Sequence, residues 1–74
     1  MKYYGINATA KSTGITESTL RRWESMGFFT ADRVFLGDNE MRMYSDELVD
    51  RLRRVKNLID SGLRVRAAFE FLNE

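Results

Sequence analysis

Residues 13–24 constrain the fold of this 74-residue chain more than any other segment. Gly14 can adopt a positive φ at no steric cost, so it can reverse the chain sharply after a preceding helix. Thr16 is a good N-cap, because its hydroxyl can accept from the unpaired amides of the next helical turn. Leu20 and Trp23 share one face of that helix, while the opposite face carries Glu17, Ser18, Arg21, Arg22 and Ser25. The segment therefore predicts a tight turn followed by a short amphipathic helix with its cations on one side.

Two interpretations of this helix are open from its periodicity alone. Short amphipathic helices with two arginines are common, and most of them are solvated surface. A helix with an apolar back and a Ser/Arg front, held at an angle by a glycine turn, also has the form of a helix-turn-helix recognition helix. The rest of the chain has to distinguish between the two.

The composition excludes several classes of function. The chain has no Cys and no His, which excludes imidazole and thiol catalysis and argues against zinc sites. The carboxylates are scattered over helix faces that we expect to be solvated. We therefore predict that the protein is not an enzyme, has no catalytic residues, and binds neither a metal nor a cofactor. With a net charge of +1, binding to nucleic acid would require the cations to be gathered into a patch.

The length and hydropathy of the chain predict one soluble domain. No apolar run approaches the length of a membrane span, and no basic-then-apolar signal peptide opens the chain. We therefore expect a cytoplasmic protein with no membrane partner. With 43% hydrophobic and 31% charged residues, residues 1–74 should form a single globular domain.

Hydrophobic periodicity predicts a mainly α-helical chain with one small β-hairpin. A turn signal at 37–40 separates two strand-forming runs, and alternation places Met41 and Met43 on one face, with Arg42 and Tyr44 on the other. Because a lone hairpin is not stable in water, this one must pack against the helices. The predicted elements are helices at 6–12 and 17–26, the hairpin at 33–44, and helices at 46–61 and 65–73.

Apolar residues of the helices, and the two aromatics after the second helix, should contribute to the core. Phe28 and Phe29 directly follow the second helix and are expected core anchors. The third helix, with Ser45 as its N-cap, carries one buried stripe consisting of Leu48, Val49, Leu52, Val55 and Ile59. Phe71 lies off the stripe of the last helix, whose buried residues should be Val65, Ala68, Phe69 and Leu72.

The order helix, glycine turn, helix, hairpin, long helix, short helix resembles the DNA-binding domain of the MerR family, a winged helix-turn-helix of bacterial regulators. Five matching motifs lie in order along nearly the whole chain. The first combines residues 6–11 and 13–15, and the second combines residues 19–24 and 27–29. The others are residue 33, residues 42–45, and the combination of residues 49–52, 58–59 and 62–63. No single motif is specific, but their order and spacing together are. The resemblance implies a nucleoid-associated protein that binds double-stranded DNA, with the second helix in the major groove and the wing on the adjacent backbone.

The candidate contacts divide into those with bases and those with the DNA backbone. Arg21 can form a bidentate contact with guanine, Ser18 can donate or accept, and Glu17 can accept from cytosine. Trp23 stands where many family members have Tyr, and its indole can pack in the core or offer its N–H to a phosphate. The other expected backbone contacts are Lys11, Arg22, Arg33, Arg42 and Tyr44, with Arg64 and Arg66 as further candidates.

The chain departs from the family pattern in three places. The family often has Pro after the recognition helix, where this chain has Thr30 and Ala31. The wing tip, residues 38–40, is acidic, although a phosphate-facing tip would be better neutral or basic. Arg64 replaces the usual Ser or Thr cap of the last helix.

Alternatives remain for the role and the assembly of the domain. Besides the DNA-binding domain of a transcription regulator, the chain could be a small architectural DNA binder, such as an excisionase or a phage factor, or a protein-interaction module that retains the fold. Full-length regulators of the family continue into a dimerising coiled coil, whereas this sequence stops at Glu74. We therefore expect a monomer for this fragment, with a homodimer possible through a C-terminal helix that is absent here.

Overall fold

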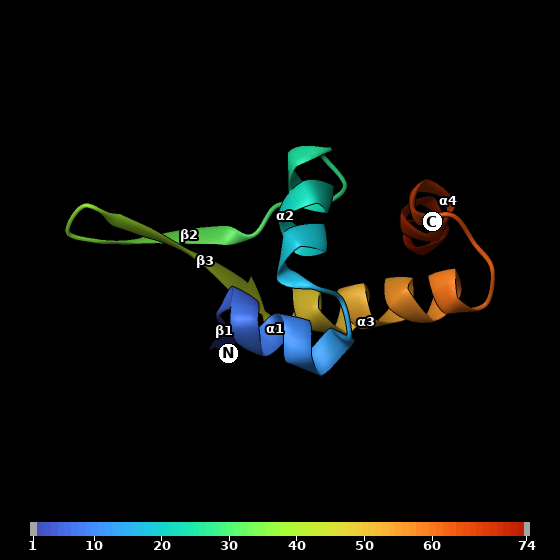
Figure 1. Cartoon of the computed structure of the whole chain (residues 1–74), viewed down its shortest axis with the longest axis horizontal. Helices are drawn as coiled ribbons and strands as arrows, with labels where there is room; N and C mark the ends of the chain where they lie inside the picture. The colour runs from blue at the N-terminus through green and yellow to red at the C-terminus, as the bar shows by residue number, and fades with distance from the viewer. Residues whose placement is uncertain (1, 74) are drawn as a thin grey trace.

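The computed structural model describes residues 2–73, and Met1 and Glu74 lie outside this range. The described residues form a mainly helical, winged helix-turn-helix fold with a small antiparallel sheet in the strand order β1–β3–β2 (Figure 1). None of its helices is long and apolar enough to cross a membrane. The elements are β1 (Tyr3–Tyr4), α1 (Ile6–Thr13), α2 (Glu17–Ser25), β2 (Asp32–Leu36), β3 (Asn39–Ser45), α3 (Asp46–Asp60) and α4 (Val65–Leu72).

The turn between α1 and α2 forms as its residues predict. Gly14 adopts φ +78°, and its amide donates to the Ala10 carbonyl over 2.9 Å, which closes the end of α1. The Thr16 hydroxyl accepts from the Thr19 amide over 3.2 Å and so caps α2. Thr13 is buried in the corner, where its hydroxyl accepts from the Ile15 amide at 3.2 Å. The angle between the two helices is therefore fixed by local hydrogen bonds on both sides of one glycine.

The helices α2, α3 and α4 each end one residue before the predicted end, and their caps explain the difference, whereas α1 extends one residue beyond its predicted end, to Thr13. The amides of Met26, Ser61 and Asn73 still donate to carbonyls of α2, α3 and α4, over distances of 2.9, 3.0 and 3.2 Å respectively. These residues continue the hydrogen-bond ladder as C-caps but no longer belong to the helices. At the other end of α3, Ser45 accepts from the Leu48 amide at 3.1 Å, which confirms its predicted role as N-cap.

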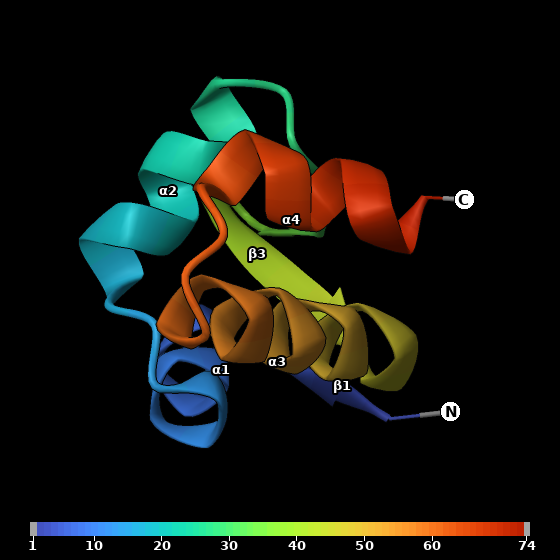
Figure 2. The ribbon, with the colours of Figure 1, turned by 90° about the vertical axis from the view of Figure 1, so that its right-hand side faces the viewer.

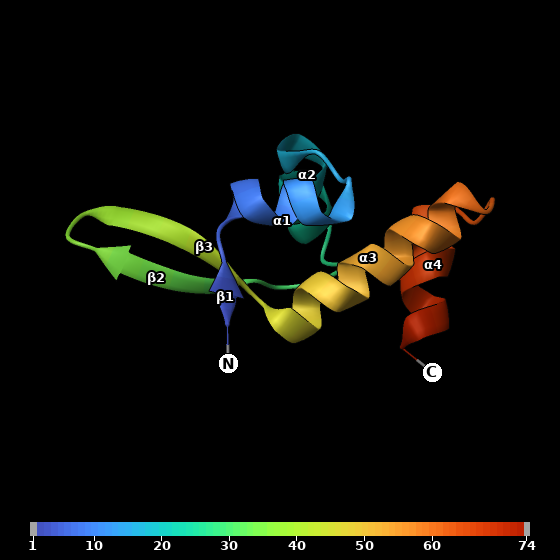
Figure 3. The same ribbon diagram turned by 90° about the horizontal axis from the view of Figure 1, so that it is seen from below.

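The hairpin of β2 and β3 projects away from the helices as a wing (Figure 1). Arg33 pairs with Arg42 across the two strands, and Val34 pairs with Met41. The turn is tighter than predicted, because β3 already begins at Asn39. Figure 3 shows the wing at one end of the molecule and α4 at the other, consistent with an elongated shape of 42 × 22 × 22 Å.

A short strand at the N-terminus extends the sheet. In β1, Tyr3 and Tyr4 pair antiparallel with Ser45 and Tyr44 of β3, and the Lys2 carbonyl accepts from the Asp46 amide at 3.2 Å. We predicted no strand here, because two residues are too few to show an alternating pattern. This pairing anchors the base of the wing beside the start of α3.

The core lies between α2, α3 and α4, at the base of the wing, and Figure 2 shows α4 beside α2 and α3. Phe69 of α4 packs edge-on against Trp23, with ring centroids 5.6 Å apart, and stacks on Phe28 at 5.1 Å. Phe29 is buried as predicted, whereas Phe28 is only half-buried. The stripe of α3 is used for this core, with Val49, Leu52 and Val55 buried and Leu48, Leu58 and Ile59 packed against it.

Candidate nucleic-acid interface

One face of α2 is held in the core and the opposite face is open to solvent. Leu20 is fully buried and Trp23 is nearly so. The exposed face carries side chains that can donate or accept hydrogen bonds and two cations, namely Ser18, Arg21, Arg22 and Ser25. The helix thus presents a polar, cationic ridge on a rigid support, which is the geometry that base-edge contacts in a major groove require.

Glu17 and Arg21 form a small network at the start of α2. The Arg21 Nη2 lies 3.5 Å from Glu17 Oε1, one helical turn away. The Asn7 Nδ2 of α1 donates to Glu17 Oε2 over 3.1 Å. Ser18 lies close by, with its hydroxyl 3.4 Å from that of Thr16. The three candidate base contacts therefore lie together on the first turns of α2, although Glu17 is already engaged by two donors.

A second network joins the end of α2 to the wing. Glu24 Oε1 accepts from Arg42 Nε over 3.0 Å, and Glu24 Oε2 lies 3.0 Å from Arg33 Nη1. The Ala31 amide, in the loop before β2, donates to the same Oε2 over 2.8 Å. One carboxylate thus holds the recognition helix, the loop and both strands of the wing.

The electrostatics of this junction favour the charged forms. Burial disfavours the carboxylate of Glu24, but hydrogen bonds from Arg33, the Ala31 amide and Arg42 outweigh it, and the pKa of Glu24 lies below its usual value. The hydrogen bond to Glu24 is the main cause of the raised pKa of Arg33. Glu24 is therefore ionised at neutral pH, and it neutralises part of the charge of two arginines that we expected to face DNA.

Two residues expected at the DNA backbone lie in the core instead. Tyr44 is 0% exposed, packs 6.1 Å from the Phe29 ring, and has a buried hydroxyl without a hydrogen-bond partner among the described residues. It shares the face of Arg42 as predicted, but it lies at the base of the wing, where the helices cover that face, so its assignment as a backbone contact was wrong. Trp23 is 7% exposed and lies against Phe69, which confirms the core interpretation and removes our reason to assign it a phosphate.

The remaining expected backbone contacts are distributed over α1, α2 and the wing. Lys11 and Arg22 are exposed and form no salt bridge with any residue in the range 2–73. Arg33 and Arg42 are partly covered at the junction with Glu24. Among the further candidates, Arg66 of α4 lies over the Phe28 ring at 5.3 Å, and Arg64 is exposed at the start of that helix.

Glu24 is the functional residue that sequence reasoning missed, although a signal for it was present. It follows Leu20 by one helical turn, so it falls on the buried side of α2. A carboxylate at an apolar position needs a cationic partner, and the predicted wing supplied Arg33 and Arg42. The pattern of a charge within a buried stripe could therefore have predicted the junction.

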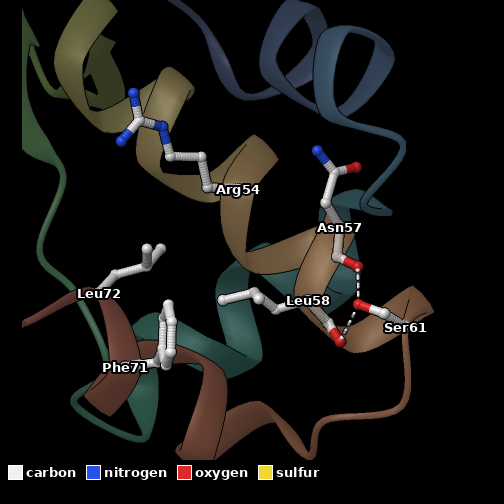
Figure 4. Close-up of a pocket in the computed structure, with 6 residues that line it drawn as sticks. All are labelled: Arg54, Asn57, Leu58, Ser61, Phe71 and Leu72. Atoms are coloured by element: carbon white, nitrogen blue, oxygen red, sulfur yellow. Dashed lines mark hydrogen bonds between the residues drawn. The ribbon is translucent and has the colours of Figure 1, made fainter.

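A groove lies between α3 and α4, away from the wing (Figure 3). Figure 4 shows Phe71 and Leu72 of α4 facing Leu58 of α3, with Arg54, Asn57 and Ser61 at the margins. The Ser61 hydroxyl donates to the carbonyls of Asn57 and Leu58, over 2.8 and 3.1 Å. Phe71 is 60% exposed, as its position off the buried stripe predicted.

This geometry defines a winged helix-turn-helix protein. A capped recognition helix presents a polar face, and a two-stranded wing is tied to its C-terminal end by a partly buried carboxylate. The model of a family described as "MerR HTH family regulatory protein" matches residues 4–74, so the chain belongs to the MerR family of DNA-binding regulators.

A curated relative supports the same assignment. The chain is 44% identical over 64 residues to the "HTH-type transcriptional repressor CarA" of Myxococcus xanthus. The match covers 85% of this chain but only 22% of that relative. The chain therefore spans about a fifth of the length of the curated relative that it matches.

Proposed function

We propose that this domain binds double-stranded DNA in a sequence-dependent manner, with α2 in the major groove and the wing on the adjacent backbone. The observation that carries the proposal is the construction of α2, whose apolar side is fixed in the core while Ser18, Arg21 and Arg22 remain exposed. A rigid helix of this kind can place side chains on base edges without losing much conformational entropy on binding.

In this proposal Arg21 is the main specificity residue. Its guanidinium can form a bidentate contact with guanine, and its partner Glu17, one helical turn away, is only weakly paired with it at 3.5 Å. Exchange of that exposed ion pair for guanine costs little, because exposed helix pairs contribute only about 0.3–0.5 kcal/mol. Ser18 and Glu17 lie beside Arg21 and can discriminate the neighbouring base pairs.

Backbone contacts come from cations on both sides of α2. Lys11 and Arg22 are exposed and Arg42 extends from the wing, so phosphates on the two margins of the groove have partners. These contacts supply affinity that depends on salt but not on sequence. Because the net charge of the chain is only +1, the location of these cations matters more than their number.

The biological role that we propose is transcription regulation. The relative CarA is named as a transcriptional repressor, and this chain resembles about a fifth of it. We propose the same class of role for the protein that contains this domain, and a location at the nucleoid in the cytoplasm. We also propose that residues 1–74 act as one folded unit that is a monomer without DNA, since the apolar stripe of α3 is used in its own core.

Selection from a library of random DNA duplexes tests the proposal. Wild-type protein should enrich a defined motif at low salt, whereas Arg21→Ala should relax the preference at one base pair and cost roughly 1–3 kcal/mol on the selected site. Arg42→Ala is the matched control, since a lost phosphate contact should weaken all sequences about equally. Failure of the wild-type protein to retain any duplex would refute DNA binding, and uniform losses in both variants would refute the role of Arg21.

A further inference from the structure

We propose that Glu24 is a positioning residue that aims Arg42 at the DNA backbone, an inference that rests on the proposed function. The side chain of Glu24 is only 9% exposed, and it lies where α2, the following loop and the wing meet. Among residues 2–73, the partners of its carboxylate belong to the loop and the wing rather than to α2 itself. Glu24 is thus built into the contact that sets the wing against the recognition helix.

The atoms of Arg42 that contact Glu24 decide where the rest of the guanidinium can point. Only the Nε of Arg42 donates to Glu24, and among the described residues its Nη1 and Nη2 have no hydrogen-bond partner. The side chain is 35% exposed, so this outer edge is accessible. A guanidinium held at Nε keeps two donors for a phosphate oxygen in a fixed orientation.

Arg33, the cross-strand neighbour of Arg42, is engaged on both sides. Its Nε lies 2.6 Å from Glu40 Oε1, while Nη1 contacts Glu24 at 3.0 Å and donates to the Ala31 carbonyl at 2.9 Å. These contacts occupy its Nε and Nη1 within the protein, whereas the only guanidinium nitrogen of Arg42 that is occupied among the described residues is Nε. The geometry therefore gives the two arginines different roles, with Arg33 as a brace of the wing and Arg42 as the contact with phosphate.

The role of Glu24 can be tested because two physical effects predict opposite results for Glu24→Gln. The substitution removes a negative charge beside a DNA-binding surface, so long-range electrostatics alone predict tighter binding. It also removes the charged partner that holds Arg42, so the positioning role predicts weaker binding. The sign of the change in affinity distinguishes the two.

The experiment is a salt titration of the binding of a fluorescently labelled, mixed-sequence DNA duplex, followed by anisotropy. Arg42→Gln should lower the steepness of log K against log[salt] by about 0.9, the value for one phosphate contact. We expect Glu24→Gln to weaken binding and to lower the slope by a similar amount. Added to Arg42→Gln, Glu24→Gln should produce no further loss of affinity, because Glu24 acts through Arg42.

Glu40→Gln is the matched control. Like Glu24→Gln, this substitution removes one negative charge and one of the two carboxylates that pair with Arg33. Glu40 lies in the wing, however, and does not contact Arg42. The variant should therefore bind the duplex as tightly as the wild-type protein or more tightly. Tighter binding by Glu24→Gln, or a full additional loss in the double variant, would overturn the positioning role.

Arg42→Lys gives an independent test if Glu24→Gln does not fold. Lysine keeps the charge, but its single ammonium group lacks the separate Nε and Nη donors that allow Glu24 and phosphate to be contacted together. We expect Arg42→Lys to bind as weakly as Arg42→Gln, and wild-type affinity would overturn the proposal. A wild-type protein that binds no duplex at low salt would instead refute the proposed function itself.

Discussion

Replacement of Trp23 by alanine should destabilise the domain in the absence of DNA. The indole is 7% exposed and packs edge-on against Phe69, so the substitution removes a large apolar side chain from the contact between α2 and α4. Truncation of a buried Trp or Phe to Ala typically costs about 3–5 kcal/mol. A chain of 74 residues has a total stability of roughly 4–11 kcal/mol. The variant should therefore lose at least about a quarter of its stability, or unfold outright.

Thermal unfolding followed by circular dichroism measures this loss. At about 4–8 °C per kcal/mol for a domain of this size, the midpoint should fall by at least about 12 °C. Phe71→Ala is the matched control, because Phe71 is an aromatic residue of the neighbouring helix that is 60% exposed. Its midpoint should stay close to that of the wild-type protein. An unchanged midpoint for Trp23→Ala, or equal losses in the two variants, would refute the assignment of Trp23 to the core.

Three further predictions concern the cap of α2, the carboxylate of Glu24 and the assembly. Thr16→Ala removes the acceptor of the Thr19 amide and should lower the unfolding free energy by about 1 kcal/mol in urea, and an unchanged midpoint would contradict the cap. Because the folded pKa of Glu24 is below its unfolded value, its contribution to stability is complete above the unfolded pKa and is lost as the pH falls through the folded pKa. Glu24→Gln should therefore flatten the acid limb of the stability profile relative to wild type, and parallel limbs would contradict the lowered pKa. Sedimentation without DNA should show a monomer, and a micromolar dimer that Phe71→Ser abolishes would contradict it.

Much of the fold could be predicted from local sequence patterns. Gly14, Thr16 and Ser45 act through their own turn or cap, so their roles depend on neighbours that are close in the chain. The stripes of α3 and α4 follow from helical periodicity, and so does the exposure of Phe71. These features need no knowledge of how distant segments pack.

The parts that could not be predicted depend on tertiary contacts. Alternation correctly placed Arg42 and Tyr44 on one face of the wing, but it gives no depth along the strand, so it did not show that the helices cover Tyr44. The pairing of β1 with β3 joins residues some forty positions apart and has no local signal. The junction at Glu24 differs from these two, because the charge within the buried stripe of α2 was a local signal for it, although its partners lie in the loop and in both strands of the wing.

An NMR titration of the isotope-labelled domain with a DNA duplex tests the central claim most directly. Two-dimensional NMR reports every backbone amide and arginine side chain in one experiment, so it locates the contact surface without a substitution. We predict the largest changes at Ser18, Arg21 and Arg22 of α2 and at Arg42 of the wing, and little change around Phe71. Changes confined to the groove between α3 and α4, with none on α2, would contradict the proposal that α2 is the DNA-recognition helix.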